Sequence, residues 1–303
     1  MVKLDIAKAF DSVSWPFLLA MLRARGFSQR WCDWIALLLS TASSHVILNG
    51  IVGDRIRHRR GLRQGDPLSP FLFILAMEPL HRLLAMAVEE GVLSRLRGRA
   101  NEARTSLYAD DAVFFVNPVK AELEAVRLIL SRFGEVTGLR VNFAKTAVIP
   151  IRCKGLDVAD IVSPLGARIA SFPCKFLGLP LSLRKLRKVD FQPLLDRIAT
   201  RLACWEAKLL SEAGRLVLLN AVLSALSVYW ISVHAMPVWV RKAIDRLRRA
   251  WLWCAETSCH GGHCKVAWSK ICRPKDLGGL GIVDLDRFGT GRTALRLKWL
   301  WLE

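Results

Sequence analysis

The sequence predicts an α+β fold over residues 1–185, with an antiparallel sheet packed on helices, followed by an α-helical region over residues 186–303. Short β-prone runs alternate with helical patterns in the first part. Two of these runs, Thr105–Tyr108 and Ala112–Val116, predict a hairpin whose tip holds two adjacent aspartates. Beyond Asp190 the pattern is helical and rich in tryptophan and basic residues, which places the boundary near residue 185.

Capping residues mark where helices begin. Ser14 followed by Pro16 predicts a helix start, because a hydroxyl satisfies a free backbone N–H and proline is tolerated in the first turn. That helix is expected to end near Gly26, and a second, capped by Ser28, near Leu39. The other expected elements are strands at Val2–Asp5, Arg140–Phe143, Ala147–Ile151 and Lys175–Leu181, a hairpin over His45–Arg57 turning at Asn49-Gly50, helices over Ser69–Val88 and Lys120–Thr137, and a loop over Pro150–Pro173.

The charge indicates an anionic partner. The chain has 45 Lys and Arg against 26 Asp and Glu, a net charge of +19. A nucleic-acid backbone is the commonest polyanion that neutralises such a surface, and an anionic membrane is the second candidate. With 52% hydrophobic residues, the chain has ample material for a core and is not expected to be disordered.

One apolar stretch, Leu216–Val240, is long enough to span a bilayer. Because polar residues interrupt it, we expect a buried helix that ends before Pro237 rather than a membrane span. The chain shows no signal or transit peptide, so we expect an intracellular protein of the nucleus or cytoplasm that is not secreted.

Eight scattered cysteines predict free thiols in a reducing compartment. They are Cys32, Cys153, Cys174, Cys204, Cys254, Cys259, Cys264 and Cys272. The last four lie near His260 and His263, so structural zinc is an alternative, but the ligand spacing is irregular and disfavours it.

Acidic residues carry the candidate chemistry. Nucleotidyl transfer uses two divalent metals, and Mg²⁺ requires hard oxygen ligands, which carboxylates supply. Asp5, at the end of a strand, and the hairpin-tip pair Asp110 and Asp111 form a candidate holder on a rigid sheet. An Asp-Asp pair in a turn is weak evidence by itself, because aspartate is a common turn residue.

Five segments resemble, in order, the palm motifs of reverse transcriptases. They are residues 4–13 (LDIAKAFDSV), 61–70 (GLRQGDPLSP), 108–111 (YADD), 138–146 (GLRVNFAKT) and 175–181 (KFLGLPL). The amino-acid sequences of these motifs are most similar to those of the LINE-type, non-LTR retrotransposon branch, and within it to plant members. Residues 268–285 resemble the region downstream of the thumb in that branch. The resemblance implies a polymerase palm over residues 1–185 and a helical thumb and connection region over residues 186–303.

The resemblance also implies the catalytic roles. Asp5, Asp110 and Asp111 are expected to bind two Mg²⁺ ions, which Mn²⁺ can replace, together with the backbone carbonyl of Ile6. Lys145 is expected to donate a proton to the departing pyrophosphate. The implied activity is RNA-directed DNA polymerisation, with an RNA template, a DNA primer and dNTPs as partners and no membrane. The oligomeric state is left open.

The resemblance implies substrate contacts as well. Phe10 is expected to pack under the sugar and exclude a 2′-OH. The other expected contacts are Gln64, Gly65 and Pro67 beside the incoming base pair and template, Tyr108 on the catalytic hairpin, and Phe176, Leu177 and Gly178 in the primer grip. Simpler structural roles compete with some of these. Asp11 is better interpreted as a cap or brace of the following helix. The alternative for Phe10 is a plain core residue, and the less favoured alternative for Lys145 is a solvated surface lysine.

The helical region combines tryptophans with basic residues, which favours a tryptophan core and a basic face toward a nucleic-acid duplex. The basic residues are Arg241, Lys242, Arg246, Arg248, Arg249 and Lys270; the tryptophans are Trp205, Trp230, Trp239, Trp251, Trp253, Trp268, Trp299 and Trp301.

The sequence departs from the family at its first residues. The fingers region and endonuclease of family members have no counterpart before Asp5, so we expect a truncated fragment that extends primers weakly or not at all. The alternative to an active polymerase is an inactive remnant that binds nucleic acid. A maturase or an RNA-templated RNA polymerase is the third reading; the motif wording disfavours the former and Phe10 the latter.

Overall fold

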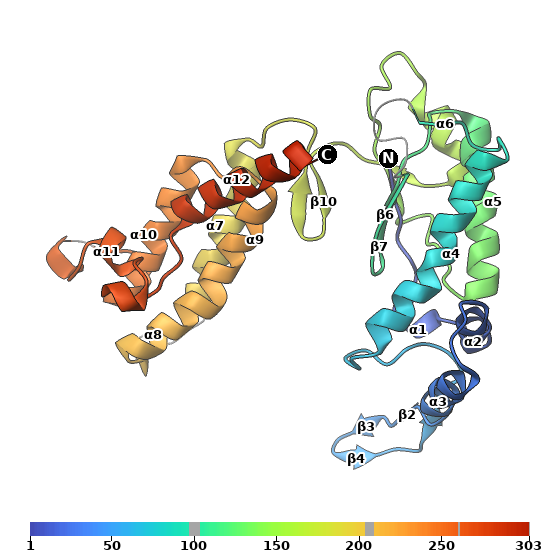
Figure 1. Ribbon diagram of the computed structural model, residues 1–303, viewed down its shortest axis with the longest axis horizontal. Coiled ribbons are helices and arrows are strands. Elements are labelled where there is room, and N and C mark those ends of the chain that lie inside the picture. Colours follow the sequence, from blue (N-terminus) through green and yellow to red (C-terminus); the bar gives the residue numbers. More distant parts are fainter. Residues whose placement is uncertain (97–103, 204–208, 260, 303) are drawn as a thin grey trace. The chain divides into compact units, whose positions relative to one another are not determined.

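The computed structural model describes residues 1–96, 104–203, 209–259 and 261–302. These form two compact units, Met1–Leu181 and Ser182–Glu303. Figure 1 labels helices and strands of both units. The division falls after Leu181, close to the boundary expected after residue 185.

A five-stranded sheet in the order β6-β7-β1-β8-β9 supports the first unit. Strand β1 lies at its centre, antiparallel to both β7 and β8. The expected antiparallel sheet is therefore present except at one edge, where β9 runs parallel to β8. The strands are β1 (Val2–Lys3), β6 (Thr105–Tyr108), β7 (Asp111–Phe114), β8 (Ala147–Val148) and β9 (Arg168–Ile169).

Three helices form the core of this unit with the sheet. They are α2 (Trp15–Ala24), α4 (Ser69–Glu89) and α5 (Lys120–Thr137), and each packs against the other two. Leu18, Phe73 and Leu130, one from each helix, are fully buried. The helix ends follow the sequence prediction: Ser14 accepts a hydrogen bond from the Phe17 amide, and α5 ends at a left-handed glycine.

A two-part hairpin occupies the expected segment between α3 (Gln29–Ser40) and α4. Strands β3 (Ile47–Leu48) and β4 (Ile51–Val52) pair around the Asn49-Gly50 turn. Strands β2 (Ser43–Ser44) and β5 (Ile56–Arg57) pair at its base. Its aliphatic side chains, such as Leu48 and Ile51, are exposed.

Three local expectations are wrong in detail. Residues 140–143 form no strand; Val141 makes one isolated bridge to Ile6. The expected loop over residues 150–173 contains α6 (Val158–Val162), a 3-10 turn η1 (Ser163–Leu165) and β9. The single strand expected over 175–181 is a hairpin of β10 (Cys174–Phe176) and β11 (Leu179–Leu181). The hairpin forms because Leu177 and Gly178 adopt positive φ values and reverse the chain.

The second unit is helical, as expected. Its helices are α7 (Lys188–Ala203), α8 (Glu212–Leu218), α9 (Ala225–Val233), α10 (Val238–Cys254), α11 (Trp268–Ile271) and α12 (Leu285–Leu302), with a π-helical turn η3 (Leu219–Ser224) and 3-10 turns η4 (Gly261–His263) and η5 (Lys275–Leu277). Trp251 is fully buried and Trp230 nearly so. Trp205 lies outside the described residues, and the side chains of Trp299 and Trp301 are not described.

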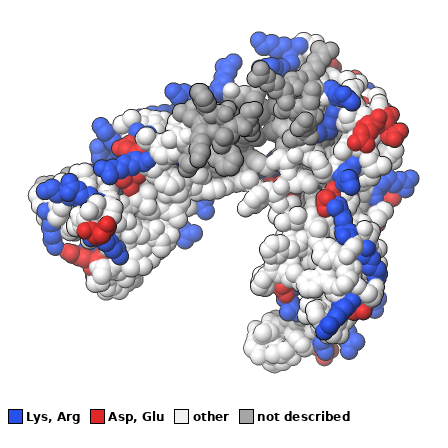
Figure 2. Space-filling model, in the orientation of Figure 1, with Lys and Arg blue, Asp and Glu red and all other residues white. Residues whose placement is uncertain are grey.

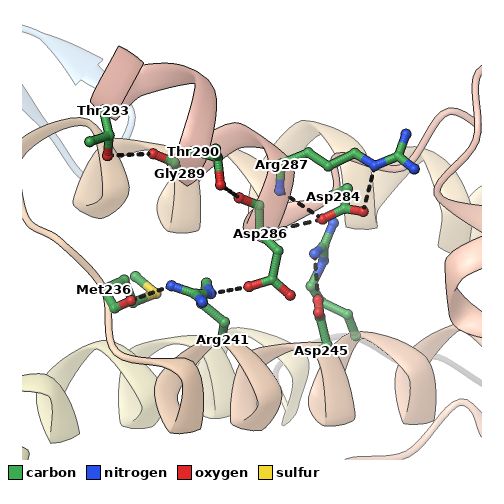
Figure 3. A network of polar contacts seen from close by, with 10 residues as sticks. Met236, Arg241, Asp245, Asp284, Asp286, Arg287, Gly289, Thr290 and Thr293 are labelled. Carbon is green, nitrogen blue, oxygen red and sulfur yellow. Dashed lines mark hydrogen bonds and ion pairs between the residues drawn. The ribbon is translucent and has the colours of Figure 1, made fainter. Parts of the chain in front are cut away.

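A polar network joins α10 to the start of α12 (Figure 3). Asp284 caps α12 by accepting hydrogen bonds from the amides of Asp286 and Arg287. Arg241 on α10 forms an ion pair with Asp286 and donates to the Met236 carbonyl at 2.5 Å. These contacts fix one end of α12 against α10.

The predicted free thiols are contradicted at one pair: Cys254 and Cys259 form a disulfide, because the chain turns back after α10 and places their Cα atoms 6.0 Å apart. The described free cysteines are Cys32, Cys153, Cys174, Cys264 and Cys272; Cys204 lies outside the described residues. Among described residues no three His, Cys, Asp or Glu side chains are grouped to hold a metal. His260, named for the zinc alternative, also lies outside them.

Two described helices, Ser69–Glu89 and Glu212–Val233, are long and apolar enough to cross a membrane by length and composition. Each buries one face within its own unit, the first through Phe73 and Leu80 and the second through Leu223 and Trp230. The second ends before Pro237, as the sequence predicts.

Candidate active site

The central strand brings Asp5 to the acidic hairpin. Val2 pairs with Phe114 and Lys3 with Val113, and the Leu4 amide donates to the Ala112 carbonyl at 2.9 Å. This contact aligns Leu4 with Ala112. If the antiparallel register is continued by one more residue, Asp5 falls opposite Asp111. The structure therefore brings the first predicted carboxylate and the hairpin tip to one end of the sheet, although about a hundred residues separate them in sequence.

The hairpin tip is a tight turn between β6 and β7. Tyr108 pairs with Asp111, so Ala109 and Asp110 are the two turn residues. Ala109 has a φ of 51°, a left-handed conformation that strains a residue with a side chain. Asp110 and Tyr108 are exposed, and Asp111 is half-buried. The turn thus holds Asp110 out toward solvent.

The main chain of Asp5 is held by the turn that follows Val141. The Asn142 amide donates to the Asp5 carbonyl at 2.8 Å. The Asp5 amide donates to the Thr146 hydroxyl at 3.3 Å, and that hydroxyl donates to the Asn142 carbonyl. Thr146 is fully buried. Asn142 and Thr146 both belong to the fourth motif, but neither had a predicted role. Their polar side chains on either side of the predicted Lys145 are the sequence signal for this contact.

Lys145 lies in this same turn. Its amide donates to the Asn142 carbonyl and side chain, both at 3.2 Å, and its side chain is exposed. The turn that holds Asp5 therefore also carries the predicted proton donor.

Gly61 in the second motif and Gly138 in the fourth allow the backbones of these motifs to pack closely against the first motif. The amides of Gly61 and Leu62 donate to the carbonyls of Val13 and Phe10, and the Ser14 amide donates to the Thr137 carbonyl. A Cβ on Gly61 would lie 2.6 Å from the Asp11 carbonyl oxygen, and one on Gly138 would lie 2.2 Å from that of Ser12. Both have positive φ. Only glycine permits such close approach, so these positions bring the motifs together.

The loop after Gly61 lies beside α1 (Ala9–Ser12). Gln64 donates to the Asp11 carboxylate at 3.2 Å, so Asp11 contacts the loop of the second motif, whereas Ser14 caps the helix that follows. A pocket of about 550 Å³ is lined by Asp11, Arg63 and Gln64, together with residues of α3 and α4. Gly65 and Pro67 are exposed nearby in the chain. This pocket is large enough for a nucleobase.

The predicted primer-grip residues form the turn of the β10–β11 hairpin. Phe176 pairs with Leu179, and Leu177 and Gly178 occupy the turn with positive φ. The ammonium of Lys3, on β1, donates to the backbone carbonyl of Lys175 in β10 at 2.8 Å. This contact joins the hairpin to the central strand.

The donor set suits a hard divalent cation, because Asp5, Asp110 and Asp111 offer only oxygen ligands. The carboxylate of Asp111 forms an ion pair with the Lys3 ammonium, with 3.7 Å between Oδ1 and Nζ. A metal shell that includes Asp111 would therefore have to compete with Lys3. The residues fit Mg²⁺ or Mn²⁺ by chemistry, and their side chains are not arranged as a formed coordination shell.

Among the charged side chains on the face shown in Figure 2, Lys and Arg cover more of the surface than Asp and Glu. Near the candidate site, Lys8, Arg59, Arg60 and Arg140 line one pocket of about 520 Å³. In the second unit, Lys242, Arg246 and Arg249 are exposed on α10 at helical spacing. Such surfaces attract phosphate backbones.

A mixed sheet whose central strand is followed closely by Asp5, beside a two-residue turn that contains Asp110, and backed by three helices, defines a palm-like fold. A family model described as reverse transcriptase (RNA-dependent DNA polymerase) matches residues 1–181. The chain therefore belongs to the reverse transcriptase family.

Retrotransposon proteins are among its relatives. The chain is 26% identical over 301 residues to the retrovirus-related Pol polyprotein from type-1 retrotransposable element R2 of Popillia japonica, covering 94% of this chain and 40% of that protein. It is 25% identical over 295 residues to the type-2 element R2DM polyprotein of Drosophila melanogaster, covering 93% and 26%. A putative ribonuclease H protein of Arabidopsis thaliana is 38% identical over 104 residues, 34% of this chain and 17% of that protein.

The family match and the R2 relatives confirm the predicted resemblance to non-LTR retrotransposon reverse transcriptases. The chain spans less than half the length of each of these three relatives. The expected similarity to plant members in particular stays a prediction.

Proposed function

We propose that the chain is the polymerase part of a non-LTR retrotransposon reverse transcriptase that adds dNTPs to a DNA primer on an RNA template. The observation that carries this proposal is the pairing of β1 with β7, because Asp5 directly follows Leu4, whose amide donates to Ala112 beside the acidic hairpin tip. Within this family, carboxylates so placed are suited to bind two Mg²⁺ ions. When bound, the metals supply charge neutralisation and activation of the primer hydroxyl.

The chain's own residues position the reactants. Asp5, held at its backbone by Asn142 and Thr146, and the turn residue Asp110 present carboxylates from a rigid sheet. Lys145, on the same turn as Asn142, offers a proton and a positive charge to the leaving pyrophosphate. Phe10 packs against the core beneath the proposed sugar position. The pocket beside Gln64 is where we place the templating base pair.

Primer extension tests the proposal. The assay uses poly(rA) annealed to oligo(dT), with dTTP and Mg²⁺ or Mn²⁺. Incorporation by this chain is expected to be weak at most and metal-dependent, and Asp110→Asn should abolish whatever incorporation is measured. Asp157→Asn, which changes an exposed helix cap far along the chain, is the matched control and should retain incorporation. Activity that survives in Asp110→Asn would contradict the carboxylate assignment.

A second candidate function is nucleic-acid binding without polymerisation. The net charge of +19 favours it independently of the carboxylates. A chain that binds the hybrid tightly, yet incorporates no dTTP with either metal, would support this candidate over the first.

A further inference from the structure

Lys3 occupies a junction between three parts of the candidate site. It lies on β1, two residues before Asp5. Its ammonium is 3.7 Å from the Asp111 carboxylate on β7 and 2.8 Å from the Lys175 carbonyl on β10. One cation therefore contacts the acidic hairpin and the predicted primer grip together.

The two contacts of Lys3 lie in partly buried surroundings, which reduce the screening of its charge by water. Its side chain is 29% exposed and that of Asp111 39%, so the pair is only partly screened by water. Burial raises the pKa of the neighbouring Cys174 thiol, and the positive charge of Lys3 opposes that rise, which places the ammonium within electrostatic reach of β10. No other ion pair to Asp111 occurs in the part of the chain that the structure describes.

We propose that Lys3 is a positioning residue that ties the β10–β11 hairpin to the central strand and serves as the internal counter-charge of Asp111. Without a bound cation the ammonium neutralises the charge of Asp111, which is one of the three carboxylates at this end of the sheet. A divalent cation entering the site competes with it for Asp111. Lys3 thereby couples the primer grip to the charge state of the metal site. This inference rests on the proposed function of Asp5, Asp110 and Asp111.

Three substitutions separate charge, geometry and non-specific effects. Lys3→Met removes the ammonium and keeps the length of the side chain, and Lys3→Arg keeps the charge and the donors. Lys154→Met removes an exposed lysine elsewhere in the same unit and is the matched control. If Lys3→Met lacks the far-ultraviolet circular dichroism of the parent, Lys3→Gln takes its place.

Two measurements on the whole chain test the proposal without an activity readout. Hydrogen exchange of the amides of residues 174–181, without metal, should be faster in Lys3→Met and close to the parent in Lys3→Arg and Lys154→Met. Binding of Mn²⁺, followed by the electron paramagnetic resonance of the free ion, should tighten about three- to tenfold in Lys3→Met, because a unit charge a few ångströms away no longer competes.

The outcomes separate this inference from the proposed function. If Asp110→Asn loses Mn²⁺ binding while Lys3→Met leaves both Mn²⁺ affinity and exchange of residues 174–181 at parent values, the role of Lys3 is overturned. If Asp110→Asn binds Mn²⁺ like the parent, the carboxylate site is wrong. The exchange rates then decide the structural tie of Lys3 by themselves.

Discussion

Phe10 stacks face to face on Phe73, with ring centroids 4.5 Å apart and an interplanar angle of 13°. Phe73 is fully buried in α4, and Phe10 is half-buried against the same core. The position predicted to select deoxynucleotides is therefore supported from below by a core helix. The two competing interpretations of Phe10, sugar selection and core packing, are compatible in one side chain.

Phe10→Ala should destabilise the first unit and relax sugar selection. Loss of the stacked ring should lower the unfolding free energy by roughly 2 kcal/mol, less than for a fully buried phenylalanine. In primer extension, the ratio of UTP to dTTP incorporation should rise. Phe10→Tyr keeps the ring and is the control for stability. An alanine variant with the parent's urea midpoint would show that the stack contributes little.

Gly138→Ala should disrupt the site far more than Gly26→Ala. Both glycines have a φ of +82°, but a Cβ meets the Ser12 carbonyl at 2.2 Å in the first and nothing within 4 Å in the second. Conformational strain alone costs about 1–2 kcal/mol, which both variants share. We expect Gly138→Ala to lose well over that amount or to fail to fold. Equal urea midpoints for the two variants would contradict the close packing.

Arg248→Met should destabilise the second unit strongly. Arg248 was expected on the basic face, and this expectation is wrong because its side chain is fully buried and donates to Asp245 at 2.7 Å. It also donates to Ser224 and the Val283 carbonyl. Removing one partner of a buried pair typically costs about 3–5 kcal/mol. Arg246→Met, exposed on the same helix, is the control. A loss under about 1 kcal/mol by chemical denaturation would mean that the pair is not effectively buried.

Cys272 should react slowly with thiol reagents. Burial raises its pKa to about 11 from an ordinary value of 9.0. At pH 8 its thiolate fraction should be on the order of a hundredfold below that of an ordinary cysteine, with alkylation slowed in proportion. Because the folded state favours the thiol, the contribution of Cys272 to stability is complete below pH 9 and is lost as the pH rises toward about 11. Cys272→Ala should remove that part of the alkaline decline.

Binding to an RNA–DNA hybrid should weaken steeply with salt. With +19 net charge, contacts to phosphates release counterions, so the logarithm of affinity should fall linearly with that of salt concentration. Fluorescence anisotropy between about 50 and 200 mM salt measures the slope. Lys242→Ala together with Arg249→Ala should reduce it, and a flat dependence in the parent would argue against phosphate contacts.

Local sequence was sufficient for features that depend on neighbouring residues. The Ser14 cap, the glycine after Thr137 and the hairpin around Asp110 follow from capping and turn chemistry. The five motifs were sufficient to identify the family. Local signals failed over residues 150–173 and at the turn of Leu177, where the chain carries no strong alternation or glycine pair to mark short strands.

The amino-acid sequence by itself determined which residues are candidates: Asp5, Asp110, Asp111 and Lys145 follow from motif wording. Only the tertiary structure decided what stands next to them. Three contacts join residues about a hundred or more positions apart in the sequence. They are the pairing of β1 with β7, the hydrogen bond from the Asp5 amide to Thr146 and the ion pair of Lys3 with Asp111. Such contacts depend on strand register and on packing of the whole unit, which no local propensity encodes.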